Sequence, residues 1–147
     1  MIALKDHPIV QLYLKHNDFG AMLGMDFELT DTGEVHYRLT VAKDHLATPI
    51  AAHGGVICAF MDATMGVRAL SNVVLENKVV STIEMKISFI APAFEGDQLT
   101  GTATILRSGK RLLFVEGQIK NQDDQLIATA SGTFNAYPME KAGFLDK

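Results

Sequence analysis

Two groups of residues in the middle of the chain could do chemistry together. One is a histidine followed by two glycines, His53, Gly54 and Gly55, and the other is the carboxylate of Asp62, nine positions after the histidine. From Gly54 to Val67 the chain carries one charge, that of Asp62, and all its other residues are apolar or small. A helix of this composition is hydrophobic nearly all round and is expected to be buried. A carboxylate in such a helix calls for a functional or structural explanation.

The spacing limits how these groups could cooperate. At about 1.5 Å of helix rise per residue, nine steps separate His53 from Asp62 by about 13 Å. The two are therefore either unrelated, or they meet across a two-fold axis between two copies of the chain. Glycines at the start of a helix let a ligand approach unpaired N–H groups at the positive end of the helix dipole. Such a turn suits a carbonyl oxygen under nucleophilic attack.

Length and composition define the class of protein. The 147 residues predict a single domain, divided into an N-terminal helix (1–22), a core (23–137) and a C-terminal tail (138–147). The net charge of −4 argues against a nucleic-acid partner. One cysteine excludes an intrachain disulfide. The N-terminus becomes charged too early for a secretory signal, and no apolar run suggests a membrane span, so we expect a cytoplasmic protein.

The periodicity of the sequence predicts a mixed order of helices and strands. We expect a first helix capped by Asp6, running to about Asn17 and ended by Gly20, and later a long buried helix from about Gly54 to Leu75. Alternating apolar and polar residues predict six strands, at Met25–Leu29, Val35–Val41, Thr82–Phe89, Gln98–Leu106, Leu112–Lys120 and Leu126–Tyr137.

These elements predict an α+β architecture in which an antiparallel sheet of five to six strands wraps around the long helix. The first two strands form a hairpin, and the short connectors between the later ones predict that the last four strands form an antiparallel meander. A helix that is apolar on every side and wrapped on one side leaves a surface to cover. The apolar helix surface that the sheet leaves uncovered predicts dimerisation.

From about Met25 to Ala136 the chain resembles the hotdog-fold acyl-CoA thioesterases, in particular the phenylacetate-pathway group within the 4-hydroxybenzoyl-CoA thioesterase-like superfamily. The resemblance rests mainly on His53-Gly54-Gly55 and on Asp62, which is followed by Ala63 and Gly66. Supporting segments are the strand 81–89, the run Ala91-Pro92-Ala93 with Gly96-Asp97, and the basic turn 107–111.

The resemblance implies a role for each motif residue. Asp62 matches the catalytic carboxylate, acting as general base on water or as nucleophile, and Gly54 matches the glycine whose backbone N–H polarises the thioester carbonyl. Gly55 supports that turn, His53 lies near the thioester, and Thr82 can position the water. The family further implies active sites at the subunit interface of dimers that join their sheets edge to edge, often paired into tetramers.

The resemblance also implies contacts with coenzyme A. Arg107, Lys110 and Arg111 lie where related proteins offer basic groups to its phosphates. Relatives often carry an asparagine six residues before the motif histidine, whereas this chain has Ala47 there, with the hydroxyl of Thr48 beside it as a substitute.

Simpler readings of the same residues remain open. Asp62 could be a structural carboxylate that bonds across a dimer interface, and His53 fits positioning better than proton transfer. Cys58 lies one turn before Asp62 in an apolar segment, so we interpret it as a small core residue. No histidine pair has metal-ligand spacing, so we expect no metal.

We therefore expect an acyl-CoA thioesterase that hydrolyses a small or medium acyl-CoA to the free acid and CoA without a cofactor. A hotdog hydratase or dehydratase is one rival. The other is a non-catalytic acyl-CoA-binding protein on the same fold, which the missing asparagine makes credible.

Overall fold

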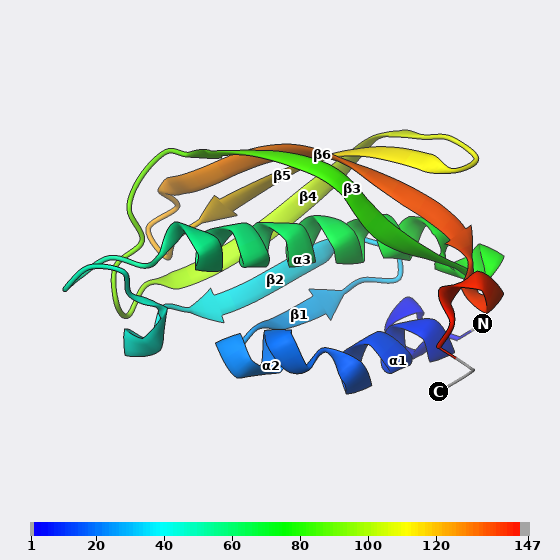
Figure 1. The fold of residues 1–147 in the computed structure, drawn as a ribbon, viewed down its shortest axis with the longest axis horizontal. Coiled ribbons are helices and arrows are strands. Elements are labelled where there is room, and N and C mark those ends of the chain that lie inside the picture. The colour runs from blue at the N-terminus through cyan, green and yellow to red at the C-terminus, as the bar shows by residue number, and fades with distance from the viewer. Residues whose placement is uncertain (1, 145–147) are drawn as a thin grey trace.

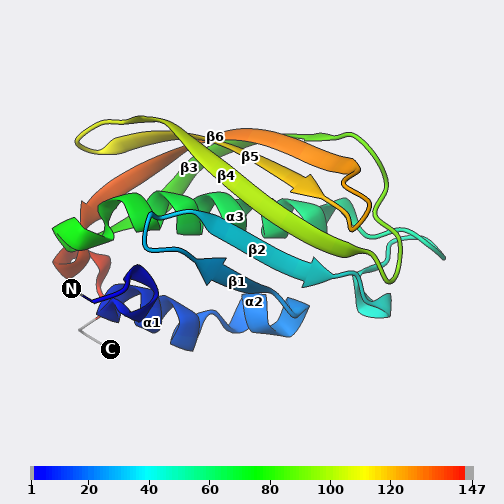
Figure 2. The ribbon, with the colours of Figure 1, turned by 180° about the vertical axis from the view of Figure 1, so that it is seen from behind.

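The computed structural model describes residues 2–144, so the end of the predicted tail lies outside the described residues. Six antiparallel strands form one sheet in the order β1-β2-β4-β5-β6-β3. The sheet curls around the long helix α3 (Gly54–Val73), as Figures 1 and 2 show. The strands are β1 (Asp26–Leu29), β2 (Val35–Thr40), β3 (Lys78–Phe89), β4 (Gln98–Ser108), β5 (Leu112–Lys120) and β6 (Leu126–Pro138). The predicted fold class and the first hairpin are confirmed.

The predicted four-strand meander is wrong for β3. β4, β5 and β6 follow one another through short connectors, but β3 pairs with β6 at the edge of the sheet and does not touch β4 as a neighbour. The eight residues 90–97 between β3 and β4 are too many for a tight turn, and they are tied to the loop before α3. Ala52 N–H donates to Ala93 O, and Glu95 N–H donates to Ile50 O. The connector therefore carries the chain around the helix instead of folding it back.

The N-terminal segment also differs from its prediction. It forms a short 3-10 turn (Leu4–Asp6) and two helices, α1 (Pro8–His16) and α2 (Asp18–Leu23). His7, and not Asp6, caps α1, because its Nδ1 accepts from Ile9 N–H. Asn17 caps α2 by accepting from the N–H of Gly20, which lies inside that helix. The segment ends at Gly24, whose φ of +73° favours glycine.

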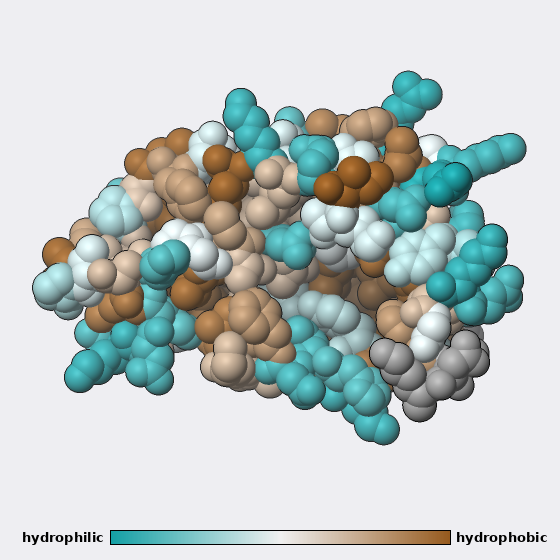
Figure 3. All heavy atoms as spheres, in the orientation of Figure 1, coloured by the Kyte–Doolittle hydropathy of each residue, from teal (hydrophilic) through white to brown (hydrophobic). Residues whose placement is uncertain are grey.

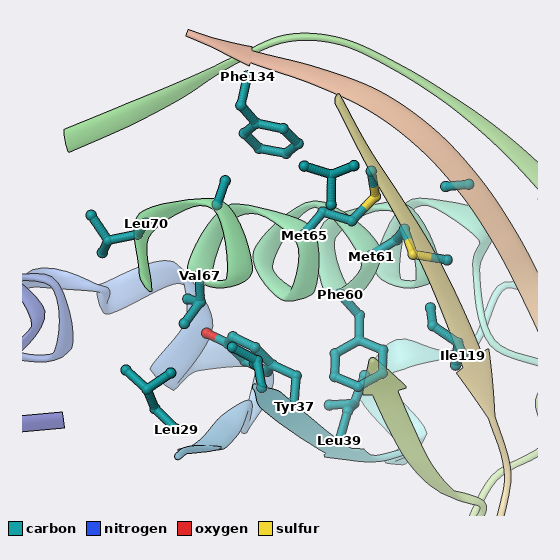
Figure 4. Close-up of a cluster of buried hydrophobic side chains, with 14 of the residues drawn as sticks. Leu29, Tyr37, Leu39, Phe60, Met61, Met65, Val67, Leu70, Ile119 and Phe134 are labelled. Atoms are coloured by element: carbon teal, nitrogen blue, oxygen red, sulfur yellow. The ribbon is translucent and has the colours of Figure 1, made fainter. Parts of the chain in front are cut away.

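The core lies between α3 and the inner face of the sheet. On β2, Val35, Tyr37 and Leu39 are buried while the residues between them are exposed, as the alternation predicts. Phe60 and Met65 of α3 are fully buried against the strands (Figure 4). The helix ends two residues before the predicted Leu75 and continues as a 3-10 turn, Val74–Glu76.

One stretch has the length and mean hydropathy of a membrane span, although the sequence analysis expected none. It comprises α3 and the 3-10 turn after it, Gly54–Glu76, and 56% of its most apolar window is buried inside the molecule. The sheet that wraps this helix accounts for its apolar composition.

Candidate active site

Asp62 lies in the third turn of α3, half-buried, on the side that faces the edge strand β3. Its Oδ1 accepts a hydrogen bond of 2.6 Å from Thr82 Oγ1, twenty residues later in the chain. The short distance is typical of a hydroxyl that donates to a charged carboxylate. Within residues 2–144 no group donates to Asp62 Oδ2, so the second oxygen is free to accept from a water molecule. The structure thus brings together the predicted pair Asp62 and Thr82.

His53 caps the start of α3. Its Nδ1 accepts from Gly55 N–H at 2.7 Å, so the proton of the neutral ring lies on Nε2. This cap occupies the N–H of Gly55, and the N–H of Val56 donates to His53 O. Within the described residues Gly54 N–H has no acceptor. It is therefore the donor of the first turn that a substrate oxygen could reach, at the positive end of the helix dipole.

Phe89, at the end of β3, covers this glycine. A Cβ placed on Gly54 would lie 3.4 Å from the Phe89 ring, at ordinary van der Waals contact, so the ring packs against this side of the glycine. The ring itself is 55% exposed in one subunit. Sequence analysis missed Phe89 as a site residue, although its position at the end of the strand that carries Thr82 was available as a signal.

Asp62 and Gly54 do not meet within one subunit. Eight helical steps separate them by about 12 Å along α3, which is one uninterrupted helix over this stretch (Figure 1). One carbonyl group cannot touch both. A second copy of the chain is needed to complete the predicted arrangement.

Tyr13 of α1 lies within electrostatic range of Asp62, which the sequence did not predict. Its hydroxyl lies 3.1 Å from that of Tyr37 and accepts from Asn17 Nδ2 at 3.2 Å. Burial raises the pKa of Tyr13, the hydrogen bond with Tyr37 lowers it, and the negative charge of Asp62 raises it further. The phenol of Tyr13 therefore lies within the field of the Asp62 carboxylate.

The hydroxyl oxygen of Thr48 is already engaged in hydrogen bonds with its own loop. Its Oγ1 accepts from the N–H groups of Ile50 and Ala51, at 3.3 and 2.9 Å, and so holds a turn in the loop before α3. The methyl group of Ala47 is exposed in the same loop. The hydroxyl of Thr48 keeps its own proton available for donation while it stabilises this turn.

Arg107, Lys110 and Arg111 are exposed at the tip of the β4–β5 hairpin. In Figure 1 this hairpin lies near the C-terminal end of α3, at the opposite end of the molecule from Gly54. Within one subunit the predicted phosphate contacts are thus far from the glycine turn.

Cys58 is half-buried on α3, and burial raises the pKa of its thiol. A raised thiol pKa disfavours the nucleophilic thiolate, which agrees with the interpretation of Cys58 as a packing residue. Among residues 2–144, no three His, Cys, Asp or Glu side chains group in a way that could hold a metal ion.

Within residues 2–144 the sheet carries a hollow on its outer face and a second one beside it, and neither is lined by the candidate residues. The larger, of about 530 Å³, lies on the outer face and is lined by polar side chains such as Lys86, Glu116 and Gln118. The second lies beside it along β4 and β5. Asp62 and Gly54 instead lie at the inner side of the β3 edge, where Figure 3 shows apolar side chains over β3 and the first turns of α3.

Comparison with known proteins identifies the family. Residues 51–128, which include the glycine turn, Asp62 and Thr82, match the Thioesterase superfamily. The chain belongs to this superfamily. Family membership and fold together confirm the predicted hotdog architecture and the class of thioester hydrolases.

Two proteins with named activities are similar to most of the chain. The acyl-coenzyme A thioesterase PaaI of Escherichia coli is 28% identical over 110 residues, which are 75% of this chain and 76% of that protein. The medium/long-chain acyl-CoA thioesterase YigI of Salmonella typhimurium is 22% identical over 139 residues, covering 84% of this chain and 88% of the relative.

Solved structures show the same fold. The E. coli PaaI protein superposes with a TM-score of 0.83 at 23% identity, covering 93% of this chain and 96% of the other. A conserved protein from Pseudomonas aeruginosa superposes with a TM-score of 0.74 at 31% identity, covering 81% and 93%.

Proposed function

We propose that this protein hydrolyses acyl-CoA thioesters, with Asp62 of one subunit and Gly54 of the other acting on the same carbonyl group. The observation that carries the proposal is the pairing of an oriented carboxylate with a helix N-terminus that has an unused donor. Asp62 is held by Thr82 with one oxygen free, and Gly54 N–H has no acceptor within the described residues. The similar proteins PaaI and YigI are named acyl-CoA thioesterases, which supports CoA esters as the substrate class.

The chemistry follows from these positions. Asp62 accepts a proton from water, which attacks the thioester carbonyl, or it attacks the carbonyl itself and is released by water. The Gly54 N–H stabilises the negative charge that develops on the carbonyl oxygen, a contribution of about 3 kcal/mol for one such donor. The C–S bond then breaks, the CoA thiolate takes up a proton, and the free acid leaves. Water and the chain's own groups suffice for every step, so the reaction needs no cofactor.

A homodimer makes the site, and CoA lies across it. An antiparallel arrangement of two subunits would bring the basic hairpin of one toward the glycine turn of the other, because the two features lie at opposite ends of one subunit (Figure 1). Arg107, Lys110 and Arg111 then bind the phosphates of CoA. His53, with Nε2–H directed away from its cap, assists in positioning the thioester.

The test is turnover of a panel of acyl-CoAs, followed by the release of free thiol. Asp62→Asn keeps the size of the side chain and an acceptor for Thr82, but it cannot take a proton from water. We expect kcat to fall at least about 100-fold, with binding of the CoA ester retained. A wild-type protein that binds acyl-CoA without releasing thiol would instead support the non-catalytic rival, and product with a hydrated acyl chain would support the hydratase.

A further inference from the structure

Three side chains between the N-terminal helices and the sheet form a hydrogen-bonded cluster that the proposed mechanism does not use. The hydroxyls of Tyr13 in α1 and Tyr37 in β2 lie 3.1 Å apart. Asn17, between α1 and α2, donates from Nδ2 to both hydroxyl oxygens, at 3.2 Å and 3.4 Å. Tyr37 is 1% exposed, whereas Tyr13 is half-buried. The cluster is therefore closed at Tyr37 and reaches the surface at Tyr13.

The cap of α2 fixes the orientation of the Asn17 amide. Its Oδ1 accepts from Gly20 N–H at 3.1 Å, so the amide nitrogen is the atom that faces the two tyrosines. An amide nitrogen has two protons to donate and accepts no hydrogen bond. Both phenol oxygens are therefore acceptors toward Asn17.

The burial of Tyr37 then decides the direction of the bond between the two hydroxyls. If Tyr13 donated to Tyr37, the proton of Tyr37 would be left in the core without an acceptor, which is costly. Tyr37 therefore donates to Tyr13. The Tyr13 oxygen accepts from Tyr37 and from Asn17, which uses both of its lone pairs. Its own proton has no acceptor within residues 2–144, so Tyr13 offers an unused O–H donor.

This donor lies close to the part of α3 that carries Asp62. The Tyr37 ring packs edge-on against Phe60, two residues before Asp62, with 5.9 Å between the ring centroids (Figure 4). The Tyr13 hydroxyl is in contact with the hydroxyl of that same Tyr37. Burial raises the pKa of the Tyr13 phenol, and the negative charge of Asp62 adds to the rise. A substrate that extends from Asp62 toward α1 would therefore meet the Tyr13 hydroxyl.

The two ends of a bound acyl-CoA lie on different sides of α3. Figures 1 and 2 both show α1 on one side of α3 and the β4–β5 hairpin on the other. In the proposed dimer, the hairpin that approaches the site belongs to the subunit that supplies Asp62, and it binds the phosphates of CoA. The acyl group therefore continues past the Asp62 carboxylate to the side of α1, where Tyr13 lies.

We propose that Tyr13 determines specificity for the acyl group by donating its O–H to an oxygen atom of that group. The inference rests on the proposed function and adds a substrate class to it, namely acyl-CoAs whose acyl group carries a hydroxyl or carbonyl oxygen beyond the thioester. A plain hydrocarbon chain in the same place would strip solvent from the donor and leave it unpaired. Sites that hydrogen-bond a polar group of the substrate discriminate against the analogue that lacks this group.

Pairs of substrates that differ by one oxygen test the proposal on the wild type. ω-Hydroxyacyl-CoAs of butyryl to octanoyl length are compared with the unsubstituted acyl-CoAs of the same length. We expect kcat/KM to favour the hydroxylated member by about tenfold at the length that places its hydroxyl at Tyr13, the effect of one hydrogen bond. Equal rates within every pair, or a preference for the unsubstituted member at every length, would overturn the proposal.

Two tyrosine variants separate specificity from structure. Tyr13→Phe removes the donor and keeps the ring, so the ratio of kcat/KM within the preferred pair should fall to about one. Tyr37→Phe is the matched control, because it removes a phenol from the same cluster and leaves the proton of Tyr13 free, so the preference should remain. Loss of the preference in both variants, or in neither, contradicts the role of Tyr13. Urea denaturation checks that both variants fold, and the comparison on the wild type stands without them.

Binding measurements separate this inference from the proposed function. CoA thioethers that carry the same pairs of chains contain no bond to hydrolyse, so calorimetry on the wild type measures recognition alone. A preference of about tenfold in Kd for the hydroxylated chain, in a protein that releases no thiol from any acyl-CoA, supports the role of Tyr13 and overturns the function. Hydrolysis of the panel without a preference in rate or in Kd keeps the function and overturns the role of Tyr13.

Discussion

At the scale of single residues, the Thr82 hydroxyl decides how the Asp62 carboxylate is held. Its 2.6 Å bond fixes one carboxylate oxygen and leaves the other for water. A hydrogen bond to a charged group contributes about 1.5–3 kcal/mol. This magnitude makes Thr82 a positioning residue whose loss is measurable even though it touches no reacting atom itself.

Thr82→Val keeps the shape of the side chain and removes the donor. We expect kcat for acyl-CoA hydrolysis to fall roughly tenfold to hundredfold, because the carboxylate loses its orientation. Thr82→Ser keeps the hydroxyl and should retain most of the activity. Steady-state kinetics on both variants distinguish them, and equal rates for Val and Ser would mean that the bond has only a structural role.

His53 affects both stability and the site, because its ring closes the first turn of α3. His53→Ala removes the cap and should lower the free energy of unfolding by about 1 kcal/mol. His53→Asn supplies another good cap and should recover this loss in urea denaturation. If activity stays low in the Asn variant while stability returns, the ring contributes to binding or positioning of the thioester beyond its role as a cap.

At the scale of secondary-structure elements, the approach of α3 to the sheet depends on glycines in the strands. A Cβ on Gly101 of β4 would lie 2.3 Å from Thr64 Oγ1 and 3.2 Å from Thr64 Cβ. Thr64 is fully buried, and its Oγ1 donates to Phe60 O, so it cannot move aside easily. The helix α3, which carries Asp62, therefore packs this close to the sheet only because β4 has no side chain at position 101.

Gly101→Ala should destabilise the fold by about 1–3 kcal/mol through overpacking. Thr64→Ala in the same chain removes two of the atoms that the new methyl group meets, so the double variant should lose less than the sum of the single changes. Chemical denaturation measures all three. Thr104→Ala, an exposed position on the same strand, is the matched control and should change stability little.

At the scale of the whole molecule, the proposed dimer combines features that one subunit keeps apart. The basic hairpin and the glycine turn lie at opposite ends of one subunit (Figure 1). An antiparallel pair of subunits places each hairpin toward the other subunit's turn. The nucleotide end of CoA and its thioester end then contact different chains.

Replacing Arg107, Lys110 and Arg111 by Gln should raise KM for acyl-CoA and leave kcat nearly unchanged. Each exposed charge contributes about 0.2–1 kcal/mol, and added salt should reduce the difference from wild type. A short thioester of N-acetylcysteamine carries no phosphates, so its kinetics should not respond to the change. An equal effect on both substrates would mean that the three substitutions act by disturbing the fold and not by removing contacts with CoA.

The sequence by itself determined the elements and the chemical candidates, because both are local patterns. Strand alternation, the apolar helix with its lone carboxylate, and the His-Gly-Gly turn can each be recognised within a few residues. It did not reveal that His7 caps the first helix, since Asp6 is the better cap by residue type and only the backbone path selects His7.

Only the tertiary structure decided which strands are neighbours and which side chains meet. β3 pairs with β6, far away in the chain, because a long connector tied to the loop before α3 prevents a simple hairpin with β4. The same placement brings Thr82 to Asp62 and Phe89 to Gly54. Such pairings depend on how separate elements pack together, and local periodicity carries no information about that packing.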